Sequence, residues 1–547
     1  MSPNLSPAAA ASSASTRSAR LVASGILLSR IAGLVREVVF ARYFGTSASA
    51  DAFRTALRMP NVLQNLLGEG VLSASFIPVY SELLRDGREE EAGRVAGAIF
   101  ALLFALAGAL ALIGMMLAPV LVTVFAPGFE GLQYELTVTL TRIIFPMTGI
   151  LVLSAWSLGV LNSHRHFFLP YVAPVLWNAA MIAAMLALGG RLQQPGLAIA
   201  LAWGALVGGA LQFMVQLPAV VRLERSLKIR WDLRREGVRV AVRNAGPAVV
   251  GRGVVQLSGY VDIVLGSLLS IGAIASLGYA QTLYMLPVSL FGMAVAAAEL
   301  PELARERASA ADVLRQRVNA GLARIAFYVV PSAIAFFTIG DVLIAALYQR
   351  GSFSPADVMV VYWVLFGYTV GLMASTGTRL FSSAYFALHD TRTPALFAML
   401  RVLTSALLGA ALMVQLGRAD LGPVSFGPYG FGWFTPPVLG TQMLGPAGLS
   451  LGAGLAAWLE WYLLRRRLKP RIGAVNPPLG PLLRMLLAAS VAGLCALLSL
   501  AVLPTLPKKL LEGVLAAGVF GIVYFVLGAI LQLDEARSVL GRLLRRR

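Results

Sequence analysis

Residues 29–84 read SRIAGLVREVVFARYFGTSASADAFRTALRMPNVLQNLLGEGVLSASFIPVYSELL, and two apolar segments meet there at a Gly-Thr-Ser-Ala-Ser turn. Charged residues lie inside both segments. On a helix that advances about 100° per residue, six polar side chains of the second segment fall within roughly 80° of one another. They are Asp51, Arg54, Arg58, Asn61, Asn65 and Glu69. The stretch therefore predicts a polar stripe along an otherwise apolar helix.

Ionisable side chains are costly at membrane depth, so such a stripe is expected to face a protein interior or a watery cavity. In the two segments arginines outnumber the acids, and the charges concerned are Arg30, Arg36, Glu37, Asp51, Arg54, Arg58 and Glu69. Positive charge left over in a cavity indicates an anionic substrate, and phosphate is the natural candidate. The alternative is a set of buried ion pairs that only packs helices together.

The composition is that of a polytopic membrane protein. The chain has 547 residues, of which 58% are hydrophobic and 13% charged, and its mean hydropathy is +0.77. Soluble domains carry about 25% charged residues. The single cysteine, Cys495, excludes a disulfide framework and a cysteine-based metal site. The net charge of +19 does not indicate nucleic acid, because the basic residues gather in alternate loops as the positive-inside rule predicts.

Apolar segments of membrane-spanning length recur along the chain, and we expect about fourteen membrane helices. The expected spans are 21–44, 52–84, 93–125, 135–161, 167–189, 196–221, 237–269, 273–303, 318–347, 357–388, 394–416, 446–465, 480–503 and 511–532. An even number places both termini on one side, and the basic loops make that side cytoplasmic. Residues 1–19 are rich in Ser, Ala and Pro and are expected to form a disordered cytoplasmic tail and not a cleaved signal.

An internal repeat predicts the architecture. FAPGF (125–129) resembles YQRGSF (348–353), and LNSHRHFFLP (161–170) resembles YFALHDTRTP (385–394), both at an offset of 224 residues; IPVYSEL (77–83) resembles LPEL (300–303) at 223. We expect two six-helix lobes, 20–222 and 223–468, followed by two helices and a basic tail in 469–547. Parallel lobes of this kind can rock about a central cavity, which is the basis of alternating access.

Motifs for enzymatic chemistry are scarce. The three histidines, His164, His166 and His389, have no acid or cysteine close enough in sequence to predict a metal site. No Walker A sequence occurs, and the clustered acids that a membrane glycosyltransferase needs are missing. The sequence therefore predicts neither an enzyme nor a cofactor.

Other features predict local structure. Prolines inside predicted helices permit kinks, and they are Pro60, Pro146, Pro174, Pro247 and Pro287. Arg252 and Gln256 lie one helical turn apart in the second lobe, where both can face the cavity. Residues 417–445 are rich in Gly, Pro and aromatic residues and predict an outer loop that is not helical.

The stretch 29–84, together with LNSHRHFFLPYVAPVLWN (161–178) and YFALHDTRTP (385–394), resembles the lipid II flippases of bacterial cell-wall synthesis, the MurJ/MviN family. The likeness covers nearly the whole chain. It implies the multidrug/oligosaccharidyl-lipid/polysaccharide exporter fold in the bacterial inner membrane. It also implies export of undecaprenyl-diphosphate-linked disaccharide-pentapeptide from the inner to the outer leaflet, with the last two helices forming a groove for the polyprenyl tail.

The family's site residues match this sequence in part. Arg30, Arg36, Asp51 and Glu69 occupy matching positions, whereas two family arginines are Gln64 and Thr282 here. Arg58 and Arg252 are our candidates for the missing positive charge. Some relatives bind sodium, but no Asp or Glu occurs between Thr393 and Arg418, so no such site is expected.

The sequence and the resemblance together predict a lipid II flippase that works by alternating access, with lipid II and membrane lipids as its partners and cell-wall synthesis enzymes as further candidates. A flippase for another polyprenyl-linked glycan, or a drug/cation antiporter of the same fold, is the alternative. A pseudo-transporter that recruits cell-wall enzymes through its basic loops is the rival from a different class.

Overall fold

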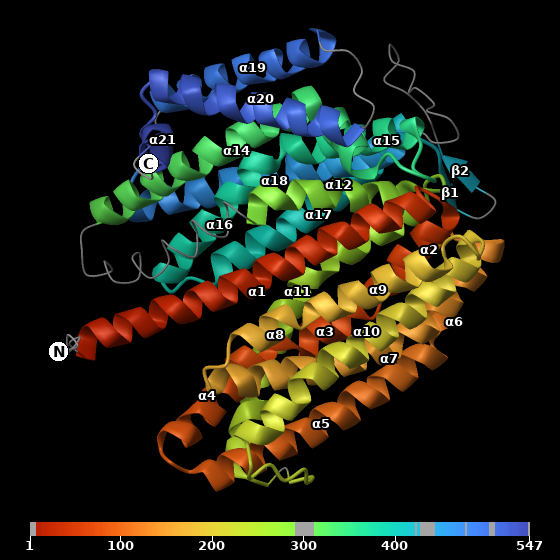
Figure 1. Ribbon diagram of the computed structural model, residues 1–547, viewed down its shortest axis with the longest axis vertical. Coiled ribbons are helices and arrows are strands. Elements are labelled where there is room, and N and C mark those ends of the chain that lie inside the picture. Colours follow the sequence, from red (N-terminus) through yellow and green to blue (C-terminus); the bar gives the residue numbers. More distant parts are fainter. Residues whose placement is uncertain are drawn as a thin grey trace. The chain divides into compact units, whose positions relative to one another are not determined.

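The computed structural model describes residues 7–232, 234–289, 311–421, 424–426, 444–475, 479–502 and 509–544, and nearly all of them are helical (Figure 1). Two short strands, β1 (Ala419–Leu421) and β2 (Val424–Phe426), pair antiparallel inside the loop that was expected not to be helical. The predicted all-α fold class is confirmed.

The chain packs into two compact units. Unit 1 comprises Met1–Phe44 and Ala48–Tyr260, and unit 2 comprises Gly45–Ser47 and Val261–Arg547. The helices of unit 1 are α1 (Pro7–Phe44), α2 (Ala48–Arg58), α3 (Asn61–Leu67), α4 (Glu69–Arg85), α5 (Glu89–Met116), α6 (Ala118–Phe125), α7 (Gly131–Ser163), α8 (Phe168–Val172), α9 (Pro174–Leu188), α10 (Gln194–Leu223) and most of α11 (Glu236–Ser267). Helix α1 starts inside the segment 1–19 that was expected to be a tail. The predicted lobe boundaries stay predictions.

Helix α7 is the centre of unit 1. It packs against α5 on one side and α10 on another, and α10 in turn packs along α9 (Figure 1). Trp156 of α7 is 1% exposed, and its indole Nε1 donates to the Ala96 carbonyl oxygen of α5 at 3.1 Å. A buried indole needs such a partner, and this bond ties α7 to α5 inside the apolar core.

Unit 2 contains the remaining described helices. They are α12 (Ala273–Pro287), α14 (Ala311–Tyr348), α15 (Pro355–Val370), α16 (Leu372–Ala387), α17 (Arg392–Leu416), α18 (Gly445–Ile472), α19 (Leu479–Val502), α20 (Lys509–Ile530) and α21 (Asp534–Leu544). Helices α17 and α18 run closely together because small residues face each other. A Cβ on Gly452 would lie 2.5 Å from the Gly409 backbone nitrogen.

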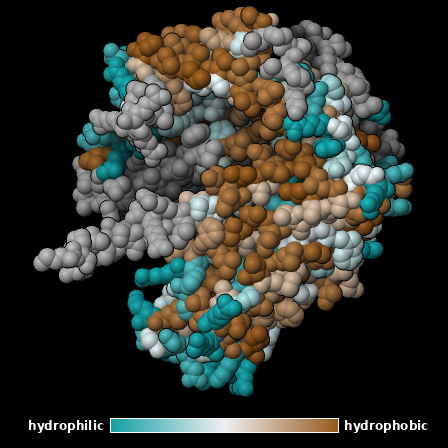
Figure 2. Space-filling view, viewed as in Figure 1, coloured by the Kyte–Doolittle hydropathy of each residue, from teal (hydrophilic) through white to brown (hydrophobic). Residues whose placement is uncertain are grey.

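The last two long helices pack onto α14. Helices α19 and α20 lie side by side above it in Figure 1, and the three share one apolar core. The Tyr524 hydroxyl of α20 donates to the Phe327 carbonyl oxygen of α14 at 2.7 Å. Figure 2 shows apolar side chains over much of the outer surface of α19 and α20. The tail groove that the resemblance implies for these helices stays a prediction.

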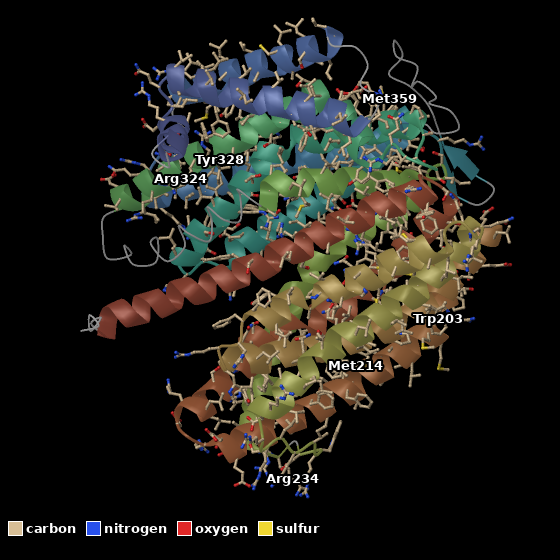
Figure 3. All side chains as sticks on the ribbon, in the orientation of Figure 1. Trp203, Met214, Arg234, Arg324, Tyr328 and Met359 are labelled. Atoms are coloured by element: carbon tan, nitrogen blue, oxygen red, sulfur yellow. The ribbon has the colours of Figure 1, made fainter. Side chains whose placement is uncertain are left out.

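Nine helical segments in the described part of the chain are long and apolar enough to cross a membrane, or ten if α15 and α16, bent by 41°, form one span. Within the described residues the expected spans fall on helices, whereas residues 290–303 of the span 273–303 lie outside the description; the number of spans stays a prediction. On α10 of unit 1, Trp203 and Met214 are each 52% exposed, and the basic residue Arg234 lies beyond the end of that helix (Figure 3). This distribution is typical of a lipid-facing helix that ends at a polar surface.

The internal repeat is visible in backbone geometry. Arg165 and His389, 224 residues apart, both adopt a left-handed conformation, with φ of 60° and 56°. Each follows a helix end closed by matching bonds, since the His166 nitrogen donates to the Leu161 oxygen and the Asp390 nitrogen donates to the Tyr385 oxygen. The two loops paired by sequence therefore fold alike.

The turn between α1 and α2 belongs to unit 2. Gly45 has φ of +54°, and its carbonyl oxygen accepts the Tyr279 hydroxyl at 2.8 Å. The Thr46 hydroxyl donates to the Asp357 carboxylate, which also caps the first turn of α15 with Ser354. A side chain at position 45 would meet the Ser352 carbonyl oxygen at 2.4 Å, so the close approach requires glycine.

Candidate functional site

A cavity of about 630 Å³ lies inside unit 1, among helices α1, α3, α4, α7, α8, α9 and α10. Most of its polar lining consists of Ser29, Arg30, Gln64, Asn65, Glu69, Ser73, Ser154, Tyr171 and Gln212, and apolar residues such as Leu151 and Leu158 of α7 complete the wall. Its size is that of a pocket for a small organic ligand or part of a larger one. Two of the predicted site residues, Arg30 and Glu69, therefore face the same space.

Breaks in the second polar segment place three of these side chains. The stretch predicted as one helix is three helices, because Pro60 lacks a backbone N–H and Gly68 ends α3. The Gly68 nitrogen donates to the Gln64 carbonyl oxygen at 2.8 Å, and a Cβ there would meet that oxygen at 2.1 Å. The helix predicted as continuous is therefore interrupted twice, and of the six residues in the predicted stripe Asn65 and Glu69 line the cavity.

Arg30 supplies positive charge to the cavity. It is exposed and, among the residues that the structure describes, makes no ion pair. Glu69 occupies the first turn of α4, where the partial positive charge of the helix N-terminus favours a carboxylate. The cavity therefore combines one guanidinium, one carboxylate and several neutral hydrogen-bonding groups.

Two other arginines of the stretch are held in an ion triad. Glu37 Oε1 accepts Arg36 Nη2 at 2.7 Å, and Glu37 Oε2 accepts Arg54 Nη2 at 2.6 Å. The guanidinium of Arg36 lies over the Trp177 ring, 5.1 Å from its centroid, and that of Arg54 lies 5.0 Å from the Phe40 centroid. Here the alternative of helix-packing ion pairs holds, and the sequence interpretation overlooked Glu37 as their shared partner.

The remaining predicted site residues lie off the cavity wall or outside the description. Asp51 is 2% exposed in the first turn of α2. Arg58 ends that helix, and its guanidinium packs against Gly259 of α11, where a Cβ would lie 2.9 Å from Nη2. The side chain of Arg252 is outside the described residues. The hypothesis that Arg58 and Arg252 replace the arginines missing at Gln64 and Thr282 stays a hypothesis.

Unit 2 contains a partly buried ion pair that sequence reasoning missed. Arg401 of α17 donates from Nη1 to Glu460 Oε2 of α18 at 3.1 Å, and Glu460 is 6% exposed. Both residues interrupt apolar segments of spanning length, so their rarity at membrane depth was a usable signal. The pair lies between helices that pack closely, which indicates a role in joining them.

The His164 side chain takes part in a network at one end of unit 1. The Tyr80 hydroxyl donates to Glu224 Oε2 at 2.6 Å and lies 2.9 Å from His164 Nε2. Burial lowers the pKa of His164, while the nearby Glu224 carboxylate opposes that shift. A neutral imidazole then donates from Nε2 to the Tyr80 oxygen. The network joins the ends of α4, α7 and α10.

Solved structures define the class of protein. The fold is similar to an inward-facing multidrug resistance MATE family transporter of the MOP superfamily, with a TM-score of 0.62, 14% identity and coverage of 81% of this chain and 95% of the other. It is also similar to the structure titled "Lipid II flippase MurJ, inward closed conformation", with a TM-score of 0.75, 22% identity and coverage of 94% and 100%. With its apolar spans and internal cavity, the chain is a polytopic membrane protein of the MATE-like transporter fold.

Sequence comparisons give the family. The model for "Lipid II flippase MurJ" matches residues 40–425. The Lipid II flippase MurJ of Burkholderia cenocepacia is 32% identical over 84% of this chain and 85% of that protein, and the probable lipid II flippase MurJ of Vibrio cholerae is 29% identical over 83% and 84%. The chain belongs to the MurJ family of lipid II flippases, as the resemblance implied. This is a transporter family and not a family of enzymes.

Proposed function

We propose that this protein exports lipid II, the undecaprenyl-diphosphate-linked disaccharide-pentapeptide, from the inner to the outer leaflet of the bacterial cytoplasmic membrane by alternating access. Both termini are then cytoplasmic, and no covalent step takes place on the protein. Family membership supports the substrate, and the MATE-like fold supports the mode of transport.

The observation that supports a binding site for this substrate is the position of Arg30 in the cavity wall and its lack of an ion pair among the described residues. Arg36 and Arg54 share the Glu37 carboxylate, whereas Arg30 lines the cavity without an ion pair among the described residues. A guanidinium in such a place offers paired N–H donors that match a diphosphate. Arg30 therefore holds the diphosphate, while the neutral polar wall of the cavity receives part of the head group.

A drug/cation antiporter of the same fold is the second candidate, because Glu69 also lines the cavity. A cation site needs a carboxylate that dominates the local charge, and here a guanidinium lines the same space. The two functions predict opposite effects of Glu69 substitution, as set out below. The basic loops support an additional role in recruiting cell-wall synthesis enzymes, which removal of Arg30 would leave unchanged.

Complementation of a conditional flippase-depleted bacterium tests the proposal. The chain, the Arg30→Ala variant and the Arg42→Ala variant are compared at equal membrane abundance. Arg42 is the matched control, because it lies on the same helix but over the Tyr43 ring, outside the cavity lining. Rescue by the parent chain and Arg42→Ala but not by Arg30→Ala is the expected result. Failure of the parent chain contradicts the lipid II assignment, and rescue by all three contradicts the role of Arg30.

A further inference from the structure

Three polar side chains form a hydrogen-bonded row between α7 and α10, which we call the amide row: Gln212, Ser154 and Gln216. Gln212 Nε2 donates to Ser154 Oγ at 3.1 Å, and Gln216 Nε2 donates to the same oxygen at 2.7 Å. Ser154 is 3% exposed and Gln216 is 1% exposed. Burying polar groups in an apolar helical bundle is costly unless they are hydrogen-bonded. The row meets this condition except at Gln216 Oε1, which is buried without a partner among the described residues.

The Ser154 hydroxyl has a proton left to donate. Its oxygen has two lone pairs, and the two amide N–H groups occupy both. Ser157 and Ser163 on the same helix donate to the backbone oxygens of Leu153 and Gly159. Within the described residues Ser154 makes no such bond, and it lines the cavity. Its O–H is therefore available to a group in the cavity.

Gln212 provides the complementary acceptor. It also lines the cavity, and its Nε2 is committed to Ser154, which leaves Oε1 for a ligand. Gln216 holds the row in place, because its Nε2 also donates to the Gln212 backbone oxygen at 2.8 Å. A donor and an acceptor thus stand side by side on the α7–α10 wall, and neither carries a charge.

We propose that Ser154 and Gln212 form a binding subsite for an uncharged group that both donates and accepts hydrogen bonds, namely a sugar hydroxyl or a carboxamide of the transported head group. The proposal rests on the proposed function and divides the cavity between two chemistries. Arg30 of α1 binds the diphosphate, and the amide row binds the neutral part of the head group. A lipid that lacks the sugar and the peptide is then bound by Arg30 and not by the amide row.

Binding to the purified full-length protein tests the subsite with three probes: lipid II, the same lipid without its pentapeptide, and undecaprenyl diphosphate. The variants are Ser154→Ala and Gln212→Leu, with Arg30→Ala for comparison. Ser157→Ala is the matched control. Ser157 is buried on the same helix, its hydroxyl donates to the Leu153 backbone oxygen, and it does not line the cavity. Melting temperatures establish that each variant is folded.

Loss of one or two neutral hydrogen bonds weakens binding by about fivefold to tenfold. We expect that loss for lipid II in Ser154→Ala and Gln212→Leu, with undecaprenyl diphosphate bound as in the parent chain and Arg30→Ala weakened for all three probes. An equal loss for the peptide-free lipid places the recognised group on the sugar, and a loss confined to lipid II places it on the peptide; both support the subsite.

Two results would overturn the proposal. Unchanged lipid II binding in both variants shows that the amide row takes no part, while the proposed function stands. An equal loss for undecaprenyl diphosphate shows that the substitutions damage the whole cavity. Lack of lipid II binding by the parent chain contradicts the proposed function itself, and the subsite with it.

Discussion

Glu37 Oε2 of α1 accepts a hydrogen bond from Arg54 Nη2 of α2 at 2.6 Å. In the sequence the two residues lie on either side of the turn Gly45–Ser47, which belongs to unit 2. The same carboxylate accepts Arg36 at 2.7 Å. One acid therefore balances two arginines in a place where the side chains are only 12–19% exposed. This relationship leaves Arg30 as the arginine of α1 that is available in the cavity.

The triad predicts a large cost for Glu37→Gln. Removing the charge leaves two guanidinium groups close together and mostly buried, which is expected to cost about 3 kcal/mol or more. The measurement is the melting temperature of the purified protein. Glu82→Gln is the control: Glu82 forms an exposed pair with Arg85 at 4.0 Å, and its loss is expected to cost below about 1 kcal/mol. Equal melting temperatures for the two variants would show that the triad does not stabilise the fold.

Glu69→Gln distinguishes an anion site from a cation site. Removing the carboxylate leaves the charge of Arg30 less opposed in their shared cavity, so undecaprenyl diphosphate is expected to bind several-fold more tightly. A site for cationic drugs would instead lose affinity for them. Equilibrium binding of undecaprenyl diphosphate and of a cationic dye to the parent chain and the variant checks this. Weaker lipid binding in the variant would contradict the role of Arg30 as the anion ligand.

His164 predicts a pH dependence of stability. Burial holds its folded-state pKa below the usual value, so as the pH falls the unfolded chain takes up a proton before the folded protein does. Stability is therefore greatest above the unfolded pKa and decreases as the pH falls toward the folded pKa. His164→Gln retains an N–H group for Tyr80 and is expected to lose less of its melting temperature between pH 8 and pH 5.5. An identical loss in both proteins would show that His164 does not titrate in this way.

Gly45→Ala tests whether the turn between α1 and α2 requires glycine. The positive φ alone costs roughly 1–2 kcal/mol for a residue with a Cβ, and overlap with the Ser352 oxygen is expected to add about 1–3 kcal/mol. Gly131→Ala is the matched control, because Gly131 has φ of +51° and open space around its Cβ position. Gly45→Ala should therefore melt clearly below Gly131→Ala. Similar melting temperatures would mean that the backbone at Ser352 moves away from the new side chain with little loss of stability.

Much of the architecture could be predicted from the sequence, because it depends on local patterns. Apolar length predicted membrane-spanning helices, of which nine or ten pass by length and composition in the described residues. The 224-residue repeat predicted two related loops, and these have matching left-handed residues at Arg165 and His389. Charge inside an apolar segment made Arg30 and Glu69 site candidates, and both side chains line one cavity in the structure.

The rest depends on tertiary structure. Periodicity treats the stretch after Ala48 as one helix, but the helix is interrupted at Pro60 and again at Gly68. The sharing of Glu37 by two arginines, and the meeting of Gln212 with Ser154 on another helix, arise only when segments far apart in the chain pack together. Helical spacing carries no information about such partners.

Lipid II translocation into proteoliposomes tests the central claim most directly. Purified parent chain, Arg30→Ala and Arg42→Ala are reconstituted at equal density with lipid II in one leaflet, and an impermeant probe of the head group measures its arrival in the other. The proposed function predicts rapid translocation by the parent chain and Arg42→Ala and at least about tenfold slower translocation by Arg30→Ala. A parent chain no faster than protein-free vesicles would contradict it.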